Sequence, residues 1–233
     1  ISNLTINRPT TDYVGLFGIT NGTSIRNIGL LGGSVTGQDV VGSLVGYNKN
    51  NSSISNAYAT GSVTGGTYVG GLVGANDSNI SNAYATGAVT GLFGGGGLVG
   101  YNYNGNINNA YATGAVAGSA SVGGLVGYNL GVIGSSYWNM ETTGQLSGVG
   151  LGSNAGMGLT TAQMFDQTNL TGLDFSNIWG NGDNQTTPYL KNLANNQVFN
   201  KNDLPSGVIS TTNRPALYTA ILNVMQLQNI NNN

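Results

Sequence analysis

The chain contains no cysteine and no histidine among its 233 residues. Without cysteine it can form no disulfide framework and no thiolate metal site. Without histidine it lacks the Ser-His-Asp triad, the histidine-based zinc sites and the commonest general base of enzymes. We therefore expect a non-enzymatic protein with no catalytic residue, no bound metal and no cofactor.

Charge is also scarce. Charged side chains make up 6% of the residues, against about 25% in an ordinary globular domain. The six basic residues are scattered, and the net charge is −2. Nucleic-acid binding needs concentrated positive charge, because phosphate neutralisation supplies most of the affinity. We therefore expect no nucleic-acid partner.

Long apolar runs are missing as well. Gly, Asn and Thr interrupt every apolar stretch after a few residues, whereas a membrane helix needs about 20 residues. No signal peptide opens the chain, and Ile1 stands directly in strand-like sequence. We expect no membrane insertion and interpret the sequence as an excised part of a longer protein.

What the chain does have is glycine, at 40 residues, and an internal repeat. Five segments align on a central leucine at positions 16, 44, 72, 98 and 125, so the spacings are 28, 28, 26 and 27 residues. The segments read YVGLFG at 13–18, VGSLVG at 41–46, VGGLVG at 69–74, GGGLVG at 95–100 and VGGLVG at 122–127.

A second block follows each first block. It reads ISNAYATG at 54–61 and 80–87 and INNAYATG at 107–114, with degenerate copies beginning at Ile25 and Ile133. Short stretches of Val, Ile, Tyr and Thr bounded by Gly and Asn predict β-strands. No helical period appears over residues 1–140.

One such repeat cannot bury an apolar face alone, so we predict that the repeats stack in register about 4.8 Å apart. Parallel crossovers are strongly right-handed. The predicted fold is therefore all-β, a right-handed parallel β-helix, or β-solenoid, of ~27-residue repeats over residues 1–140. A Gly-rich β-sandwich of hairpins is the alternative. One repeat position holds Asn27, Asn56, Asn82 and Asn109, and we expect an internal or corner amide ladder there.

The repeated blocks resemble the GLUG repeat family, named for a Gly-Leu-x-Gly signature. Matching segments are residues 15–18, 71–74, 97–100 and 124–127, while Ser43 replaces the first Gly of the second repeat. Proteins with such repeats are mostly large bacterial exoproteins, including filamentous-haemagglutinin-like adhesins of two-partner secretion systems and the stalks of some immunoglobulin A peptidases. The resemblance implies an extracellular display or adhesion role and transfers no binding residues. Those peptidases use a histidine-containing zinc motif, so this chain is not their catalytic part.

The period is lost after about residue 140, and residues 141–233 are expected to form an irregular C-terminal extension or cap. Thr160 and Gln163 fit a capping box, which predicts a short helix near 161–166. Residues 174–190 allow a further coil. A second helix is expected over 215–228, after Pro215, where we favour a cap over the open end of the solenoid to a partner-binding helix.

Two side-chain ladders are candidate ligand faces. Tyr58, Tyr84 and Tyr111 share one repeat position, which Tyr137 continues, and Thr60, Thr86 and Thr113 share the position two residues later. Exposed, the tyrosines would suit a sugar or a receptor strand, and a flat threonine array would suit ice. Each tyrosine lies four residues after an isoleucine, which in a regular strand puts both on one side. This spacing favours burial of the tyrosines.

The acidic residues offer little chemistry. A glycosidase needs two facing carboxylates, and Asp12 and Asp39 stand near one repeat position without evident partners. Asp183 lies in an Asn-Gly-Asp-Asn turn that does not match a calcium-loop spacing. Gly94–Gly97 lack the Lys-Ser/Thr ending of a phosphate loop, and we interpret them as a corner.

The leading functional hypothesis is a structural and adhesive segment of a secreted or surface-displayed bacterial exoprotein. The expected partners are a receptor on a host cell or other surface, protein or glycan, and an outer-membrane secretion partner of the parent protein. A specific glycan- or protein-binding module on the solenoid face is the second hypothesis. An ice-binding surface and a polysaccharide-active β-helix rank below both.

Overall fold

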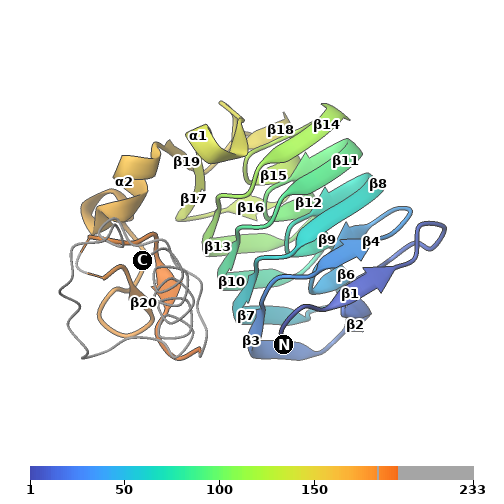
Figure 1. Ribbon diagram of the computed structural model, residues 1–233, viewed down its shortest axis with the longest axis horizontal. Coiled ribbons are helices and arrows are strands. Elements are labelled where there is room, and N and C mark those ends of the chain that lie inside the picture. The colour runs from blue at the N-terminus through green and yellow to red at the C-terminus, as the bar shows by residue number, and fades with distance from the viewer. Residues whose placement is uncertain (183, 194–233) are drawn as a thin grey trace, which may run out of the picture.

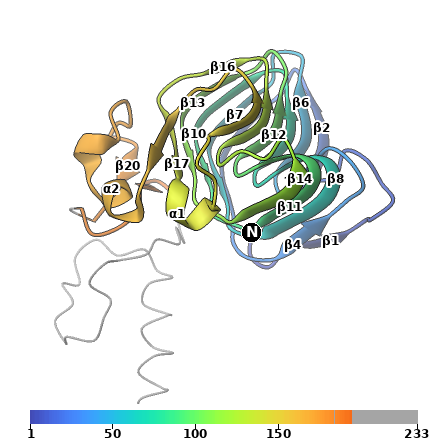
Figure 2. The same cartoon turned by 90° about the horizontal axis from the view of Figure 1, so that it is seen from above.

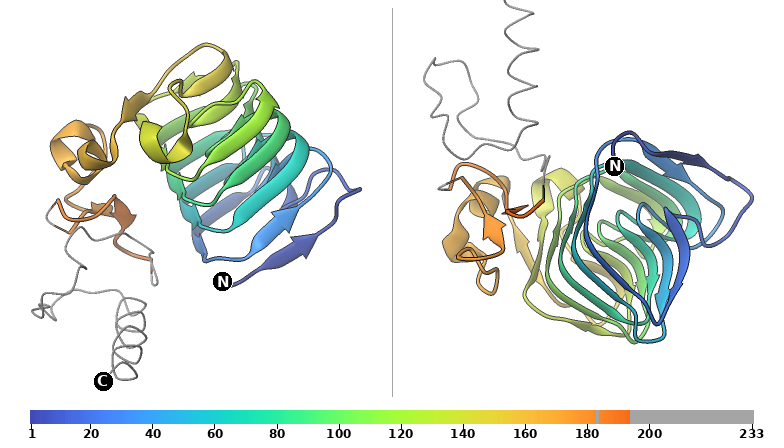
Figure 3. Two further views of the ribbon diagram at one scale, coloured as in Figure 1. Left: turned by 45° about the horizontal axis from the view of Figure 1, so that its top comes forward. Right: turned by 90° about the horizontal axis from the view of Figure 1, so that it is seen from below.

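The computed structural model describes residues 1–182 and 184–193. Three sheets run along the molecule, and each coil of the chain gives one strand to each sheet in turn (Figure 1). The coils lie one behind another when the molecule is viewed along the stack (Figures 2 and 3).

Sheet one holds, in spatial order, β1 (Thr5–Asn7), β4 (Ser34–Thr36), β8 (Ser62–Gly70), β11 (Val89–Gly96) and β14 (Val116–Ala120), with β5 (Val41–Gly42) beside β8. Sheet two holds β2 (Phe17–Asn21), β6 (Val45–Lys49), β9 (Val73–Asn76), β12 (Val99–Asn102), β15 (Val126–Asn129) and β18 (Val149–Gly152). Sheet three holds β3 (Ser24–Leu30), β7 (Ser53–Ala59), β10 (Asn79–Ala85), β13 (Asn106–Ala112), β17 (Ser136–Asn139) and β19 (Met157–Leu159), with β16 (Val132–Ile133) beside β13.

All strand pairs in these three sheets are parallel. Repeat-equivalent residues face each other, so Tyr84 pairs with Tyr58 on one side and with Tyr111 on the other. The predicted β-solenoid is confirmed. The alternative sandwich of hairpins is wrong, because a hairpin joins antiparallel strands.

The leucines of the first block form one column inside the solenoid. Leu44, Leu72, Leu98 and Leu125 are all 0% exposed and belong to a single core cluster. The backbone N–H of each donates to the carbonyl of the next, with N···O distances of 2.9 Å at all three links. Stacking in register therefore buries the same side chain in every coil.

Glycines beside these leucines allow the coils to approach closely. A Cβ on Gly97 would lie 2.2 Å from the carbonyl oxygen of Gly124, and one on Gly71 would lie 2.2 Å from that of Gly97. Real Cβ atoms do not come this close to backbone. The neighbouring coil thus favours Gly at 71 and 97, the first Gly of the Gly-Leu-x-Gly signature, whereas Ser43 stands at this position in the second repeat.

A buried amide ladder runs between sheets two and three. Asn48, Asn76, Asn102 and Asn129 are at most 1% exposed. Each Nδ2 donates to the Oδ1 of the next, at 2.8, 2.9 and 2.8 Å, and Thr20 Oγ1 donates to Asn48 Oδ1 at 2.8 Å. Hydrogen bonding of these buried polar groups offsets their desolvation. Sequence analysis placed the amide ladder at a different position.

That predicted position, Asn27, Asn56, Asn82 and Asn109, has another role. All four residues have positive φ, between 48° and 56°. One predicted link is present, because Asn56 Nδ2 donates to Asn27 Oδ1 at 3.2 Å. Asn tolerates the left-handed region better than other non-Gly residues. These asparagines therefore place a kink at the same point of four strands of sheet three, β3, β7, β10 and β13.

Parallel pairing continues past residue 140, the predicted end of the solenoid, because β18 pairs with β15 and β19 with β17. Between β17 and β18, α1 (Met140–Thr143) begins at the N-cap Asn139, whose side chain accepts from two backbone N–H groups. Trp138 and Met140 pack on the interior core. The chain thus closes the C-terminal end of the stack with these two side chains.

The C-terminal extension, residues 159–193, leaves the stack. It contains α2 (Thr161–Phe165), the 3₁₀ helix η1 (Gln167–Asn169), and β20 (Trp179–Gly180) paired antiparallel with β21 (Tyr189–Leu190). The predicted capping box of Thr160 and Gln163 is confirmed. The coil allowed for 174–190 is wrong, because β20 and β21 are antiparallel and separate from the three sheets.

The described part of this extension lies beside sheet three rather than over an open end (Figures 1 and 2). The predicted helix over 215–228 and Asp183 fall outside the described residues. Among residues 1–182 and 184–193, none of the helices is long and apolar enough to cross a membrane.

Candidate functional surface

The tyrosines of the second block form what we call the covered column: Tyr58, Tyr84, Tyr111 and Tyr137. Ile54, Ala57 and Ala59 of the same strand belong to the interior core, whereas Tyr58 belongs to a separate cluster. The left-handed Asn56 breaks the two-residue alternation, so Tyr58 lies on the opposite side from Ile54. The expected burial is confirmed, but the expectation that both share one side is wrong.

The C-terminal extension buries this column from outside. Tyr84 is 0% exposed, and its ring stacks on those of Tyr58 and Tyr111 with centroids 5.0 Å apart in both cases. Trp179 of the extension packs at 6.1 Å from the Tyr84 ring and 5.9 Å from the Tyr111 ring. A column on the outer side of a sheet has thereby become a second core.

Hydrogen bonds fix the extension over the covered column. The Tyr111 hydroxyl donates to the Pro188 carbonyl at 2.5 Å, and the Tyr137 hydroxyl donates to the Thr171 carbonyl. Burial raises the pKa of the Tyr84 phenol well above its usual value, with further contributions from Tyr111 and Tyr58. Burial also raises the pKa of Tyr111. The phenols of Tyr84 and Tyr111 are therefore neutral at physiological pH, and that of Tyr111 serves as a buried hydrogen-bond donor.

The predicted threonine ladder gives no flat exposed array. Thr60, Thr86 and Thr113 follow the ends of β7, β10 and β13, where they are partly buried at a corner of the coil. Thr60 Oγ1 accepts from the backbone N–H of Gly32 at 2.7 Å. This position therefore supports the corner rather than a regular surface of the kind that ice binding needs.

A second set of aromatic side chains faces solvent, and we call it the tyrosine face. Its central column runs across sheet two, where register pairs the following residues in order: Ile19, Tyr47, Ala75, Tyr101, Tyr128 and Leu151. The neighbouring position along each strand is the buried amide ladder, Asn48 and its equivalents. Three further tyrosines flank the column: Tyr13, Tyr68 and Tyr103.

The rings of the tyrosine face are ordered by contact with one another. Tyr101 stacks between Tyr68 and Tyr128, at centroid distances of 4.7 and 4.9 Å, and Tyr103 meets its edge at 5.7 Å. Tyr13 stacks on Tyr47 at 6.2 Å. Tyr13 and Tyr103 are 44% and 45% exposed. The result is a pre-arranged aromatic surface that carries phenol hydroxyls.

Left-handed corners bring the flanking rings to the column. Tyr13 and Tyr68 have φ of 57° and 55°, and Val40 and Ser121 occupy the same left-handed position in other coils. Tyr68 lies in the coil of Ala75, the one small residue of the central column among its tyrosines. Its ring reaches Tyr101 in the next coil, so the column stays aromatic where Ala75 interrupts it.

Two charged side chains of opposite sign border the tyrosine face. Lys49 Nζ lies 5.6 Å from the centroid of the Tyr47 ring, within the range of a cation–π contact. Burial and then the Asp77 carboxylate raise the pKa of Tyr47. Burial and the neighbouring Tyr128 and Tyr68 raise the pKa of Tyr101. The hydroxyls of Tyr47 and Tyr101 are therefore neutral near pH 7.

The acidic residues considered for catalysis bind backbone. Asp12 Oδ1 accepts from the N–H of Asp39 at 3.2 Å, and Asp39 Oδ1 accepts from the N–H of Thr67 at 2.6 Å. Each carboxylate thus supports the left-handed corner of the next coil. Among residues 1–182 and 184–193, no three acidic side chains gather in a way that would hold a metal ion. Gly94, with φ of 67°, forms the predicted corner in its glycine run.

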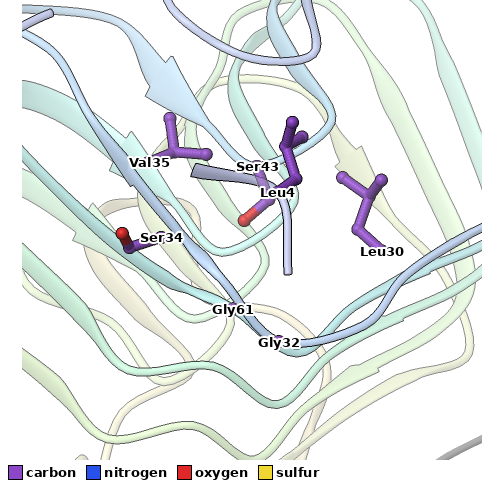
Figure 4. Close-up of a pocket in the computed structure, with 7 residues that line it drawn as sticks. All are labelled: Leu4, Leu30, Gly32, Ser34, Val35, Ser43 and Gly61. Carbon is purple, nitrogen blue, oxygen red and sulfur yellow. The ribbon is translucent and has the colours of Figure 1, made fainter. Parts of the chain in front are cut away.

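A small recess lies near the N-terminal end of the stack (Figure 4). Its lining is largely apolar and includes Leu4, Leu30 and Val35 beside Ser34 and Ser43. The volume is ≈ 10 Å³, about the room for one water molecule. It has no arrangement of groups for a ligand.

Sequence analysis missed the tyrosine face, although a signal was present. Tyr47, Tyr101 and Tyr128 each stand three residues after the repeat leucine, and Ile19 and Ala75 occupy the same position. The ladders predicted from the sequence lie in the second block, whereas this column directly follows the first block. Tyr13, Tyr68 and Tyr103 join only through the folded coils.

Comparison with known proteins gives two similarities. The GLUG motif matches residues 65–90 and 91–117. A stretch of 78 residues, 33% of this chain, is 42% identical to halomucin from Haloquadratum walsbyi. That stretch covers only 1% of halomucin. No solved structure matches the chain.

Proposed function

We propose that the chain is a structural and adhesive segment of a long secreted or surface-displayed repeat protein. Its coils act as a rigid spacer that holds attachment surfaces away from a cell. The proposed role is to present surfaces for binding, and we propose no catalytic reaction. A bacterial source, a two-partner secretion route and an outer-membrane secretion partner belong to the same proposal and rest on the family resemblance.

The observation that carries the proposal is the column Leu44, Leu72, Leu98 and Leu125, in which four successive coils bury the same side chain against one another. In such an array each repeat contacts only its neighbours, so coils can be added without changing the rest. Each coil adds about 4.8 Å to the length. This property suits a spacer whose reach is set by repeat number.

The comparisons support a surface-protein setting. GLUG repeats are present, and the matched stretch of halomucin is a small fraction of that protein, as expected for a repeat unit within a much longer chain. The low charge and the Asn, Ser and Thr of the solenoid suit a surface kept soluble by neutral polar groups. The proposed partner is a receptor, protein or glycan, on a host cell or another surface.

Surface display is tested with antibodies raised against the purified chain and applied to intact cells of its source. We expect staining of unpermeabilised cells, and loss of that staining after brief external protease treatment. Staining that appears only after permeabilisation would refute the proposal. Purified chain fixed to beads, applied to candidate surfaces, tests the adhesive part separately.

A further inference from the structure

We propose that the tyrosine face binds a neutral polysaccharide, an inference that rests on the proposed display function and names the ligand class of its attachment surface. The residues that carry it are Tyr47, Tyr101 and Tyr128 of the central column with the flanking Tyr68 and Tyr103. Their rings are held in place by stacking on one another and, for Tyr47, on Tyr13. Nothing in the described chain covers them as the extension covers Tyr84.

Prior order of the rings favours binding. Tyr101 is held on both faces by Tyr68 and Tyr128, at 4.7 and 4.9 Å, so its orientation is set before any ligand arrives. Binding surfaces lose affinity when mobile side chains must be ordered. Tyrosine has few rotatable bonds and presents an apolar ring with a polar tip. Such a surface can contact the apolar faces of sugar rings and hydrogen-bond their hydroxyls at the same time.

The charge of the surface selects a neutral ligand. The six strands of sheet two and the residues directly after them contain two charged side chains, Lys49 and Asp77, of opposite sign. A polyanion such as a sulfated glycan or a nucleic acid would need a cluster of cations, which Lys49 alone does not provide. Phenol hydroxyls both donate and accept hydrogen bonds, as sugar hydroxyls do.

The repeat of the surface favours a polymer over a small molecule or a folded protein. Tyr47, Tyr101 and Tyr128 occupy one repeat position along the solenoid axis, and the rings of Tyr101 and Tyr128, in successive coils, lie 4.9 Å apart. A chain of repeating units can occupy several such positions at once, and linked weak contacts add through high effective concentration. Protein hot spots combine Tyr and Trp with Arg, and the strands of sheet two contain neither Trp nor Arg.

The test uses the whole chain and soluble neutral polysaccharides, namely galactomannan, hydroxyethyl cellulose and dextran, measured by affinity electrophoresis and titration calorimetry. We expect at least one of them to bind, and heparin not to bind. Tyr101→Ala should weaken that binding at least about tenfold, because it removes the ring on which Tyr68, Tyr103 and Tyr128 rest. Tyr101→Phe keeps the ring and should cost about two- to tenfold.

Leu92→Ala is the matched control, because Leu92 is an exposed apolar residue on β11 of sheet one, at 68% exposure. It should leave binding unchanged. Circular dichroism and thermal unfolding of each variant separate a lost contact from a lost fold. Tyr47→Ala, which leaves the Tyr101 stack in place, provides a second variant if Tyr101→Ala unfolds.

Three outcomes would overturn the inference: no binding to any of the three neutral polysaccharides, equal binding by wild type and both alanine variants, or self-association of the chain through these tyrosines in light scattering. Capture of a protein receptor through Tyr101 without polysaccharide binding would also overturn it. In each case staining of intact cells would still uphold the proposed display function. Staining confined to permeabilised cells would refute that function without removing any polysaccharide binding.

Discussion

The covered column and the tyrosine face are built in the same way and differ in exposure. Tyr84 and Tyr101 both lie on the outer side of a sheet, and both stack on two rings at close to 5 Å. Tyr84 is buried beneath Trp179, whereas the rings around Tyr101 remain in contact with solvent. Stacking of repeats therefore produces aromatic columns, but it does not determine whether a column is buried or exposed. The covered column is buried because the C-terminal extension packs on it.

The largest expected effect comes from a substitution that separates neighbouring coils and so destabilises the solenoid that carries both columns. Gly97→Ala places a Cβ 2.2 Å from the Gly124 carbonyl oxygen and 2.7 Å from the Ala112 Cβ, so neighbouring coils must separate. We expect a loss of about 4 kcal/mol in unfolding free energy, in the range of severe core disruption. Urea unfolding followed by circular dichroism measures it.

Gly95→Ala is the matched control in the same glycine run. The nearest atoms to a Cβ there are 3.7 Å away, an ordinary contact. The change should alter stability by less than about 0.5 kcal/mol. Equal effects of the two substitutions would contradict the close approach of the coils at Gly97.

Trp179→Ala should separate the two columns. It removes the side chain that packs against Tyr84 and Tyr111 and should weaken docking of the extension by about 3 kcal/mol, as for other buried aromatic truncations. Hydrogen exchange should then rise in residues 159–193 while strands β6, β9 and β12 stay protected. Phe93→Ala, near Tyr68, should leave the extension protected. Loss of protection throughout the solenoid would show that the extension is part of one cooperative unit.

Alkaline titration tests the burial of the covered column. The Tyr84 pKa in the folded chain is well above the unfolded value of about 10. Its contribution to stability is therefore complete below pH 10 and is lost as the pH rises from there toward the folded pKa. Phenolate absorbance at high pH should show a late phase from Tyr84 and Tyr111, whose pKa values burial raises, together with a change in Trp179 fluorescence. A titration without that change in fluorescence would contradict the burial of these two rings beneath Trp179.

The smallest effect concerns one hydroxyl. Tyr111→Phe keeps the ring but leaves the Pro188 carbonyl without its donor, which should cost about 1 kcal/mol. Tyr128→Phe removes a hydroxyl at the tyrosine face and should lower the unfolding free energy by less than about 0.5 kcal/mol. Thermal unfolding of the pair measures the difference, and identical midpoints would indicate that the Pro188 contact contributes nothing.

Much of the fold was predictable from the repeat alone. The five leucines and the block around Tyr84 predicted a stack of parallel coils, and Thr160 with Gln163 predicted α2. The side on which Tyr58 lies was not predictable from strand alternation, because Asn56 takes a left-handed conformation and reverses it. The amide ladder was assigned to Asn27 and its equivalents because the sequence does not show which of the recurring asparagine positions is buried. The buried positions are Asn48, Asn76, Asn102 and Asn129, and only the coil corners show this.

The candidate surface was predictable only in part. Tyr47, Tyr101 and Tyr128 share a repeat position in the sequence, so their column follows from stacking. The ring contacts of Tyr101 with Tyr68 and Tyr103 do not follow from stacking, since Tyr68 lies at a corner of the coil and Tyr103 in a turn. Repetition along the chain predicts ladders, but it does not predict which side chains from different parts of a coil will meet.

The sequence by itself determined that equivalent residues stack, because a repeat of about 27 residues cannot bury its apolar face alone and buries it against its own copies. The tertiary structure decided which aromatic column is core and which is surface. That choice depends on where residues 159–193 pack, a contact between segments as distant as Asn82 and Trp179, whose Nε1 donates to the Asn82 Oδ1 at 3.4 Å. Local periodicity carries no information about such a contact, because burial is a property of the assembled surface.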